Sequence, residues 1–150
     1  MAVVTLVQPT ESLIEHFGNN LRPIDRLEAA LFSGQVPMDA IRESVVSSFD
    51  SKVALVDDQP VCIFGIAAGT DVCFPWLLGT HLMDEQPPVR IMVQAREFLS
   101  KDTSLYLRNA ILSDNIRSIR FLSGLGFSFT PAFDYEGYSV KLFERRPICA

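Results

Sequence analysis

The spacing of apolar residues along the chain alternates between a period of two and a period near 3.6, which predicts a mixture of strands and helices. The clearest unit lies in the last third. Residues 105–112 are mostly apolar and favour a buried strand, and apolar residues recur at helical spacing over 116–125 before 127–129 return to a period of two. Asp114 can accept hydrogen bonds from the first turn of this helix, and Gly126 can end it. The pattern predicts strand, short helix, strand.

The first half of the chain predicts one strand followed by three helices. Residues 2–7 are rich in β-branched side chains and favour a strand. Thr10 can cap a helix that Gly18 ends, a second helix runs over 23–34 from a proline to a glycine, and Pro37 begins a third. The apolar side chains expected to face the core from these helices are Leu13, Ile14, Phe17, Ile24, Leu27, Ala30, Leu31, Met38, Ile41, Val45 and Phe49.

The middle of the chain predicts three consecutive strands. Residues 52–56 and 61–68 are strand-like and are joined at 57–60, where the sequence Asp-Asp-Gln-Pro favours a hairpin turn. A third strand is predicted at 72–78. Pro75 removes one donor from that strand, and a proline of this kind belongs at a sheet edge or a bulge.

The rest of the chain completes an α/β (α+β) pattern. A loop at 79–86 precedes a helix over 87–99 that opens with two prolines, and the last strands are predicted at 127–133 and 138–143 with a turn between them. The elements predict a mixed, mostly antiparallel sheet with helices on both faces. We expect a single domain over residues 1–150 because no repeat, linker or low-complexity segment interrupts the pattern.

Composition and charge narrow the classes of function. Lys and Arg number 13 against 18 Asp and Glu, a net charge of -5, which disfavours a nucleic-acid-binding surface. The apolar runs are far shorter than a membrane helix requires, and no basic segment precedes an apolar one at the N-terminus, so we expect a soluble protein of the cytoplasm. The three cysteines and two histidines are widely separated, which predicts reduced cysteines and no metal site.

The order of residues from 114 to 127 resembles a known family motif. The matching residues are Asp114, Asn115, Ser118, Phe121, Leu122, Leu125, Gly126 and Phe127. They are similar to the C-terminal motif N-x-x-A-x-x-L-Y-x-x-x-G-F of the GNAT superfamily of N-acetyltransferases. The chain also resembles small GNAT-like proteins that tailed bacteriophages encode near their virion-assembly genes. An ordinary amphipathic helix with a glycine stop is the alternative interpretation of the same residues.

The resemblance implies where a cofactor would bind. GNAT enzymes hold the pyrophosphate of acetyl-CoA on backbone N–H groups before the central helix, which here corresponds to residues 78–88. The implied cofactor-binding residues are Leu78, Gly79, Thr80 and Asn115. The segment departs from the family pattern, because Gly79 is its single glycine, two prolines donate no N–H and the acidic residues Asp84 and Glu85 would repel a diphosphate. A solvated acidic turn before a helix is the alternative interpretation.

The groups that would perform catalysis are also incomplete. The tyrosine that often protonates the departing thiolate in the family corresponds to Leu122, which has no proton to donate. His81 is the candidate base, and a loop histidine without a chemical role is the alternative. Cys73 has no evident basic partner to make it a nucleophile, and Asn109 is an amide in a predicted central strand, where burial demands hydrogen-bond partners.

These features favour a noncatalytic GNAT-like accessory protein that contacts a phage virion or host protein, located in the host cytoplasm or associated with the virion. No cofactor is expected under this hypothesis. The alternatives are a divergent acyl-CoA-dependent N-acyltransferase, which would use acetyl-CoA, and a binder of a small ligand that uses the cleft without chemistry.

Overall fold

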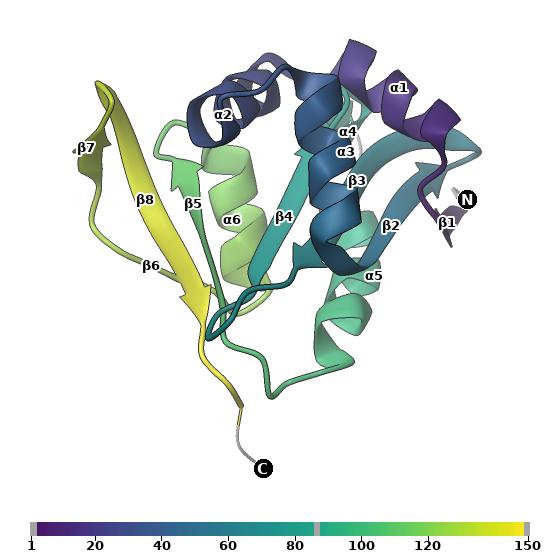
Figure 1. The fold of residues 1–150 in the computed structure, drawn as a ribbon. Coiled ribbons are helices and arrows are strands. Elements are labelled where there is room, and N and C mark those ends of the chain that lie inside the picture. Colours follow the sequence, from purple (N-terminus) through teal and green to yellow (C-terminus); the bar gives the residue numbers. More distant parts are fainter. Residues whose placement is uncertain (1–2, 86–87, 149–150) are drawn as a thin grey trace.

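The computed structural model describes residues 3–85 and 88–148 and arranges them in three layers (Figure 1). In chain order the elements are β1 (Val4–Val7), α1 (Glu11–Asn20), α2 (Pro23–Ser33), α3 (Pro37–Ser47), β2 (Ser48–Val56), β3 (Gln59–Ala67), β4 (Phe74–Gly79), α4 (Leu82–Glu85), α5 (Pro88–Ser100), β5 (Leu107–Leu112), α6 (Ile116–Gly124), β6 (Ser128–Phe129), β7 (Phe133–Tyr135) and β8 (Tyr138–Arg145).

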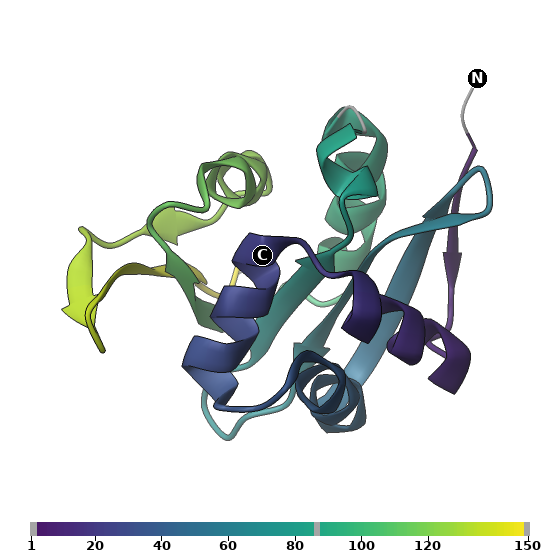
Figure 2. The same cartoon turned by 90° about the horizontal axis from the view of Figure 1, so that it is seen from above.

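The strands form two sheets that lie next to each other. β1, β2, β3 and β4 make an antiparallel sheet in that order, and β5, β8 and β6 make a second one in which β7 also pairs with β8. Figure 2 shows α1 and α3 on one side of the sheets and α5 and α6 on the other. The predicted fold class, a mixed and mainly antiparallel sheet with helices on both faces, is confirmed.

Two clusters of buried apolar side chains attach the helices to the first sheet. Ile63 packs with Phe17 and Ile41 of α1 and α3, and all three side chains are fully buried. The next residue, Phe64, points to the opposite face, where its ring meets that of Phe98 on α5 edge to face at a centroid distance of 5.0 Å. Strand β3 is therefore covered on both faces, as its run of buried residues requires.

The two hairpins that the sequence predicts are confirmed, with tighter turns. Asp57 and Asp58 join β2 to β3, and Glu136 and Gly137 join β7 to β8, with φ values of 49°, 64°, 52° and 83°. A two-residue turn with positive φ matches the twist of the strands on either side of it. Pro60, predicted as part of the first turn, already belongs to β3.

Helix α1 does not end at Gly18, contrary to the sequence prediction. The helix continues to Asn20, and a Cβ placed on Gly18 would lie 3.0 Å from the Cβ of Met38 on α3. This glycine therefore allows two helices to pack closely rather than stopping one of them. Phe49, expected on the buried side of the third helix, lies instead in β2 and is 55% exposed.

Two further predictions need correction. The loop expected at 79–86 contains the short helix α4, and Gln86 lies outside the described residues. The strand expected at 127–133 is divided into β6 and β7, because Pro131 between them has no N–H to donate to a ladder. Near this break, Thr130 pairs with β8 through two hydrogen bonds. Its N–H donates to the carbonyl of Leu142, and its hydroxyl accepts the N–H of Leu142.

The two sheets meet at a parallel pairing between the start of β4 and β5 that lasts for a single bridge. Cys73 donates its N–H to the carbonyl of Tyr106 at 2.8 Å and accepts the N–H of Arg108 at 3.0 Å. In a parallel ladder the next N–H to donate would be that of residue 75, which is a proline. The side chain of Asn109 takes the place of the missing rung: its Nδ2 donates to the carbonyl of Pro75 at 2.9 Å, and its Oδ1 accepts the N–H of Ala110 at 2.8 Å.

We predict that Asn109→Ala destabilises the fold by about 1–3 kcal/mol, since it leaves the Pro75 carbonyl and the Ala110 N–H without their partner. Urea unfolding of both proteins measures the difference. Asn20→Ala is the matched control, because its amide also donates to a carbonyl, at 2.7 Å from His16, but at an exposed helix end. Equal losses in the two variants would contradict the role of Asn109 in joining the sheets.

Candidate functional site

The parting of β4 from β5 leaves a cavity of about 200 Å³ between the two sheets. Its walls are mainly apolar and come from both faces: Phe98 and Phe121 belong to α5 and α6, and Ala29 and Phe32 belong to α2. The lining residues with a hydrogen-bonding side chain are Glu28, Ser33, Ser44, Trp76, Asn109, Asn115 and Ser118. A cavity that crosses a sheet in this way can bring two reactants, or a ligand and a protein group, together from opposite sides.

Glu28 is the charged group in the described wall of this cavity. Its Oε1 accepts the side-chain amide of Asn115 at 2.8 Å and the backbone N–H of Leu112 at 3.3 Å. Burial raises the pKa of Glu28 from its usual value to about 7, although the hydrogen bonds from Asn115 and Leu112 act in the opposite direction. A carboxyl that titrates near neutral pH inside a cavity can accept or donate a proton there.

A buried ion pair closes the end of β4 nearby. Arg22 and Asp25, which are 4% and 1% exposed, are joined by two hydrogen bonds, the shorter of 2.6 Å from Nε to Oδ2. Asp25 also accepts the N–H of Gly79 at 3.0 Å, and Arg22 reaches Asp84 of α4 at 3.0 Å. Burial raises the pKa of Asp25, while the hydrogen bonds and charge of Arg22 act to lower it. These hydrogen bonds connect the start of α2 to the end of β4 and to α4.

The backbone N–H groups after β4 point into the protein. Gly79 donates to Asp25 as described, Thr80 donates to the carbonyl of Val61 at 3.0 Å, and Leu82 donates to the hydroxyl of Thr80 at 3.3 Å. Within α4 the N–H groups of residues 83 and 84 donate to the carbonyls of residues 80 and 81. These groups belong to the first part of the segment that the resemblance implies for the phosphates.

The residues predicted to bind a cofactor are distributed between two places. Leu78 and Asn115 line the cavity. Gly79 and Thr80 are buried at the end of β4, and Met83 covers Gly79 so closely that a Cβ there would lie 2.7 Å from its sulfur. Their role in cofactor binding remains a prediction, and the last part of the implied loop includes residues 86 and 87, which lie outside the described residues.

The other candidates from the sequence also have definite positions. His81 is exposed and is not one of the described residues that line the cavity, so its role as a base stays a prediction. Leu122, at the position of the family tyrosine, does line the cavity, as does Trp76, whose Nε1 donates to the hydroxyl of Ser48 at 2.8 Å. Cys73 takes part in the bridge between the sheets and is partly exposed.

The side chains of Asn115 and Arg117 are each directed to a carboxylate on another helix. Asn115 is the N-cap residue of α6, but its side chain makes no capping bond and is directed to Glu28 instead. Arg117 lies 3.8 Å from Asp84, so this carboxylate is close to two guanidinium groups. The acidic group next to this face of α6 is therefore Asp84 of the chain itself.

Sequence reasoning missed the charged face of α2. It assigned Leu27 to the buried side, yet Leu27 is 37% exposed, and Asp25 and Glu28 face inward. A signal was present, because Arg22, Asp25 and Glu28 recur at intervals of three residues and share the face that carries Ala29. Charges that lie on one helical face with a small residue can be expected to compensate one another inside the protein.

No metal-binding group of three or more His, Cys, Asp or Glu side chains occurs within residues 3–85 and 88–148. Over the same ranges no helix is long and apolar enough to cross a membrane. Cys149, one of the three cysteines considered above, lies outside the described residues.

Comparison with solved structures identifies the architecture. A structure of AAC(6')-Ib in complex with paromomycin and acetyl-CoA has a TM-score of 0.66 at 17% identity, over 95% of this chain and 93% of that one. An acetyltransferase of the GNAT family from Streptococcus pneumoniae has a TM-score of 0.62 at 12% identity, over 95% and 98% of the chains. A ribosomal L7/L12 alpha-N-protein acetyltransferase in complex with coenzyme A has a TM-score of 0.66 at 9% identity, over 95% and 93%.

The chain has the GNAT fold. No protein-family model matches the sequence, and no curated protein matches it. At these identities the structural likeness shows the fold, and the parting of β4 and β5 supplies the central cleft of that fold. The chemistry of the cleft has to be argued from the residues of this chain.

We predict that Glu28→Gln changes how stability depends on pH. The folded pKa of about 7 lies above the ordinary value of 4.5, so the folded chain holds a proton that the unfolded chain releases as the pH rises between these values. Wild-type stability should therefore fall relative to Glu28→Gln by up to about 3 kcal/mol between pH 5 and about pH 8. Urea unfolding of both proteins across this range measures the difference, and parallel profiles would show that Glu28 titrates normally.

Proposed function

We propose that this GNAT-fold protein has no acetyltransferase activity and acts through contacts with other proteins. The observation that carries the proposal is the use of the N–H groups after β4 for internal hydrogen bonds. A diphosphate at this position would have to displace the carboxylate of Asp25 from Gly79 and the carbonyl of Val61 from Thr80. Leaving either of these buried oxygens without a hydrogen bond would cost about 1–3 kcal/mol.

The charges at this position support the same proposal. Asp25 and Asp84 bring two carboxylates to the end of β4. Arg22, which could attract a phosphate, bonds to both, and Arg117 lies 3.8 Å from Asp84, so both guanidinium groups are already paired with carboxylates. Leu122 at the family tyrosine position adds no proton donor to the cavity. A closed anion site and a missing acid are consistent with a fold that is retained without its reaction.

An exposed aromatic surface is the candidate for protein contacts. Tyr135 and Tyr138 are paired directly across the β7–β8 hairpin, and the ring of Phe32 on α2 lies 6.1 Å from that of Tyr135. Each tyrosine is 42% exposed, as is Phe133. Figure 1 shows this hairpin at the edge of the molecule farthest from β1. Tyrosine and phenylalanine are enriched at protein interfaces, and neighbouring exposed rings are more informative than scattered ones.

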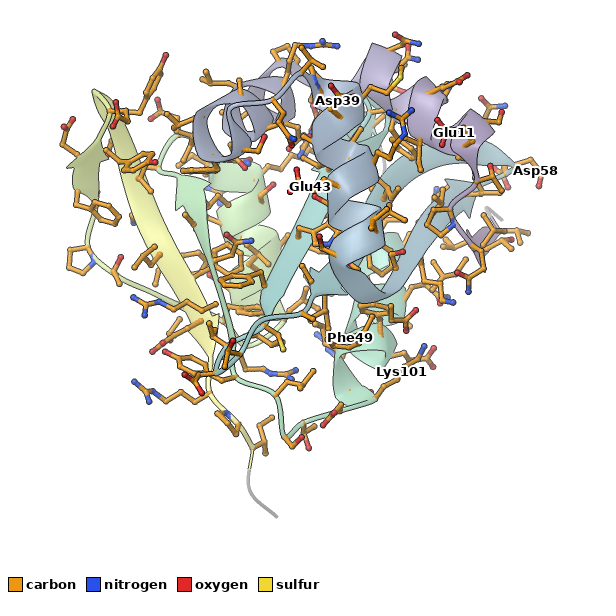
Figure 3. All side chains as sticks on the ribbon, in the orientation of Figure 1. Glu11, Asp39, Glu43, Phe49, Asp58 and Lys101 are labelled. Atoms are coloured by element: carbon orange, nitrogen blue, oxygen red, sulfur yellow. The ribbon has the colours of Figure 1, made fainter. Side chains whose placement is uncertain are left out.

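The net charge favours proteins over nucleic acids as partners. Glu11, Asp39 and Glu43 project from α1 and α3 (Figure 3), where Arg42 pairs with Glu11 and Asp39. The whole sequence has a net charge of -5, which disfavours a phosphate backbone as the partner. The resemblance of residues 114–127 to phage proteins encoded near virion-assembly genes leads us to propose a virion or host protein as the partner, with the chain in the host cytoplasm or associated with the virion.

Calorimetric titration with acetyl-CoA tests the closed cofactor site. We expect no saturable heat up to about 1 mM ligand, because the N–H groups of residues 79, 80 and 82–84 already donate within the protein. A spermidine N-acetyltransferase whose structure contains coenzyme A serves as the positive control. Micromolar binding that stoichiometrically saturates the protein would overturn the noncatalytic proposal.

The protein-contact part of the proposal has its own test. Affinity capture from phage-infected cells should recover a virion or host protein at defined stoichiometry with the wild type, and should lose it with the double variant Tyr135→Ser and Tyr138→Ser. Val46→Ser is the matched control, since Val46 is 79% exposed on α3, away from the hairpin. Recovery of nothing, or equal recovery by the double variant, would contradict a partner at this surface.

Glu28 favours a second candidate, an acyl-CoA-dependent N-acyltransferase. A carboxyl with a pKa of about 7 in the cavity between the parted strands is suited to act as a general base on an amine. Under this alternative acetyl-CoA would bind in the titration above, and Glu28→Gln would remove transfer to an amine while leaving cofactor binding in place. Absence of binding would leave Glu28 without an acyl donor.

A further inference from the structure

The cavity between the two sheets has a marked preference in charge. Glu28 is the one ionisable acid in its described lining, and no Lys, Arg or His is present there. Arg22 lies close by but bonds to Asp25 and Asp84, as described above. A carboxylate or phosphate entering the cavity would leave water, meet the negative charge of Glu28 and find no cation, so anions are strongly disfavoured.

Among the seven described lining side chains that can form hydrogen bonds, Glu28 is the one that is ionisable. The two hydrogen bonds to Glu28 both end on Oε1, and no described residue donates to Oε2. The amide of Asn109, which also lines the cavity, is occupied by Pro75 and Ala110. The remaining surface is formed largely by Phe, Leu, Ile and Ala side chains. A few polar groups in a mainly apolar space are the arrangement of a small-molecule site.

We propose that this cavity binds an uncharged, mainly apolar molecule whose single hydroxyl head pairs with Glu28. The volume of about 200 Å³ is sufficient, because an engineered apolar cavity of about 150 Å³ in another protein binds benzene. A hydroxyl can donate to the carboxylate and accept from the carboxylic acid, so it pairs with Glu28 in either protonation state. The proposal rests on the proposed function in one respect, that no phosphate group of a cofactor is anchored beside the cavity.

The probe is 1-hexanol, added to the full chain at pH 7.5 and followed by two-dimensional NMR of the backbone amides. The amide signals of Ala110, Leu112 and Asn115 should shift saturably, since they surround Glu28 and the parted strands. Affinity should rise by about fourfold for each methylene from 1-butanol to 1-hexanol, the value expected for burying a methylene group. Hexanoate should bind at least about tenfold more weakly than 1-hexanol because it carries a charge.

A cavity-filling variant shows whether the alcohol occupies the space between the sheets. Ala110→Leu adds a larger side chain to the cavity wall and should weaken 1-hexanol at least about tenfold. Ala29→Leu fills the same space from α2, and it is tested in place of Ala110→Leu if that variant does not fold. Val46→Leu, at a surface position, should bind the alcohol as the wild type does.

The outcomes separate this inference from the proposed function. Absence of saturable shifts, equal binding of hexanoate, or tighter binding of hexylamine than of 1-hexanol would overturn the uncharged ligand class. Unchanged binding in both filling variants would place the alcohol elsewhere and also overturn it. Acetyl-CoA binding in the separate calorimetric titration would overturn the noncatalytic proposal, whatever the result with alcohols.

Discussion

The structure depends on how two neighbouring strands separate. β4 and β5 begin as a parallel pair at Cys73, and the next rung cannot form because Pro75 has no N–H. Asn109 supplies an amide in its place, so the Pro75 carbonyl and the Ala110 N–H keep a partner while the strands diverge. Without this substitution the gap would expose unpaired backbone groups in the interior, which proteins avoid. The cavity therefore follows from one proline and one asparagine.

Helix α2 determines what this gap can hold. Its N-cap and inward face present Arg22, Asp25 and Glu28 at intervals of three residues, and these side chains reach the end of β4, helix α4 and the junction of β5 with α6. A buried ion pair contributes little net stability once its desolvation is counted, but it fixes geometry because a misplaced partner leaves a bare charge. The same helix face brings the carboxylate of Asp25 to the strand end and places one carboxyl with a pKa near 7 in the cavity.

Much of the fold could be predicted from the sequence, because strands and helices leave local periodic patterns. The hairpin after β2, the strand, helix and strand around α6, and the layered arrangement all follow from such patterns. The candidate site could not be predicted in the same way. Asp25 bonds to Gly79, 54 positions away, and Glu28 bonds to Leu112, 84 positions away, and the resulting compensation of charge is invisible to any local window. An apolar face was therefore expected where α2 buries its charges.

A fold and its usual reaction can separate because they depend on different groups. The two sheets of this chain are held by burial and by the Asn109 rung, and neither needs a cofactor. Phosphate recognition needs free N–H donors and a positive field. Here the N–H groups of residues 79, 80 and 82–84 donate internally, and Arg22 and Arg117 both lie beside Asp84. The gap between the sheets is lined mainly by apolar side chains and holds one carboxyl whose pKa lies near 7, an environment that penalises any charge not matched within it. These are the physical grounds on which we propose a neutral ligand for the gap.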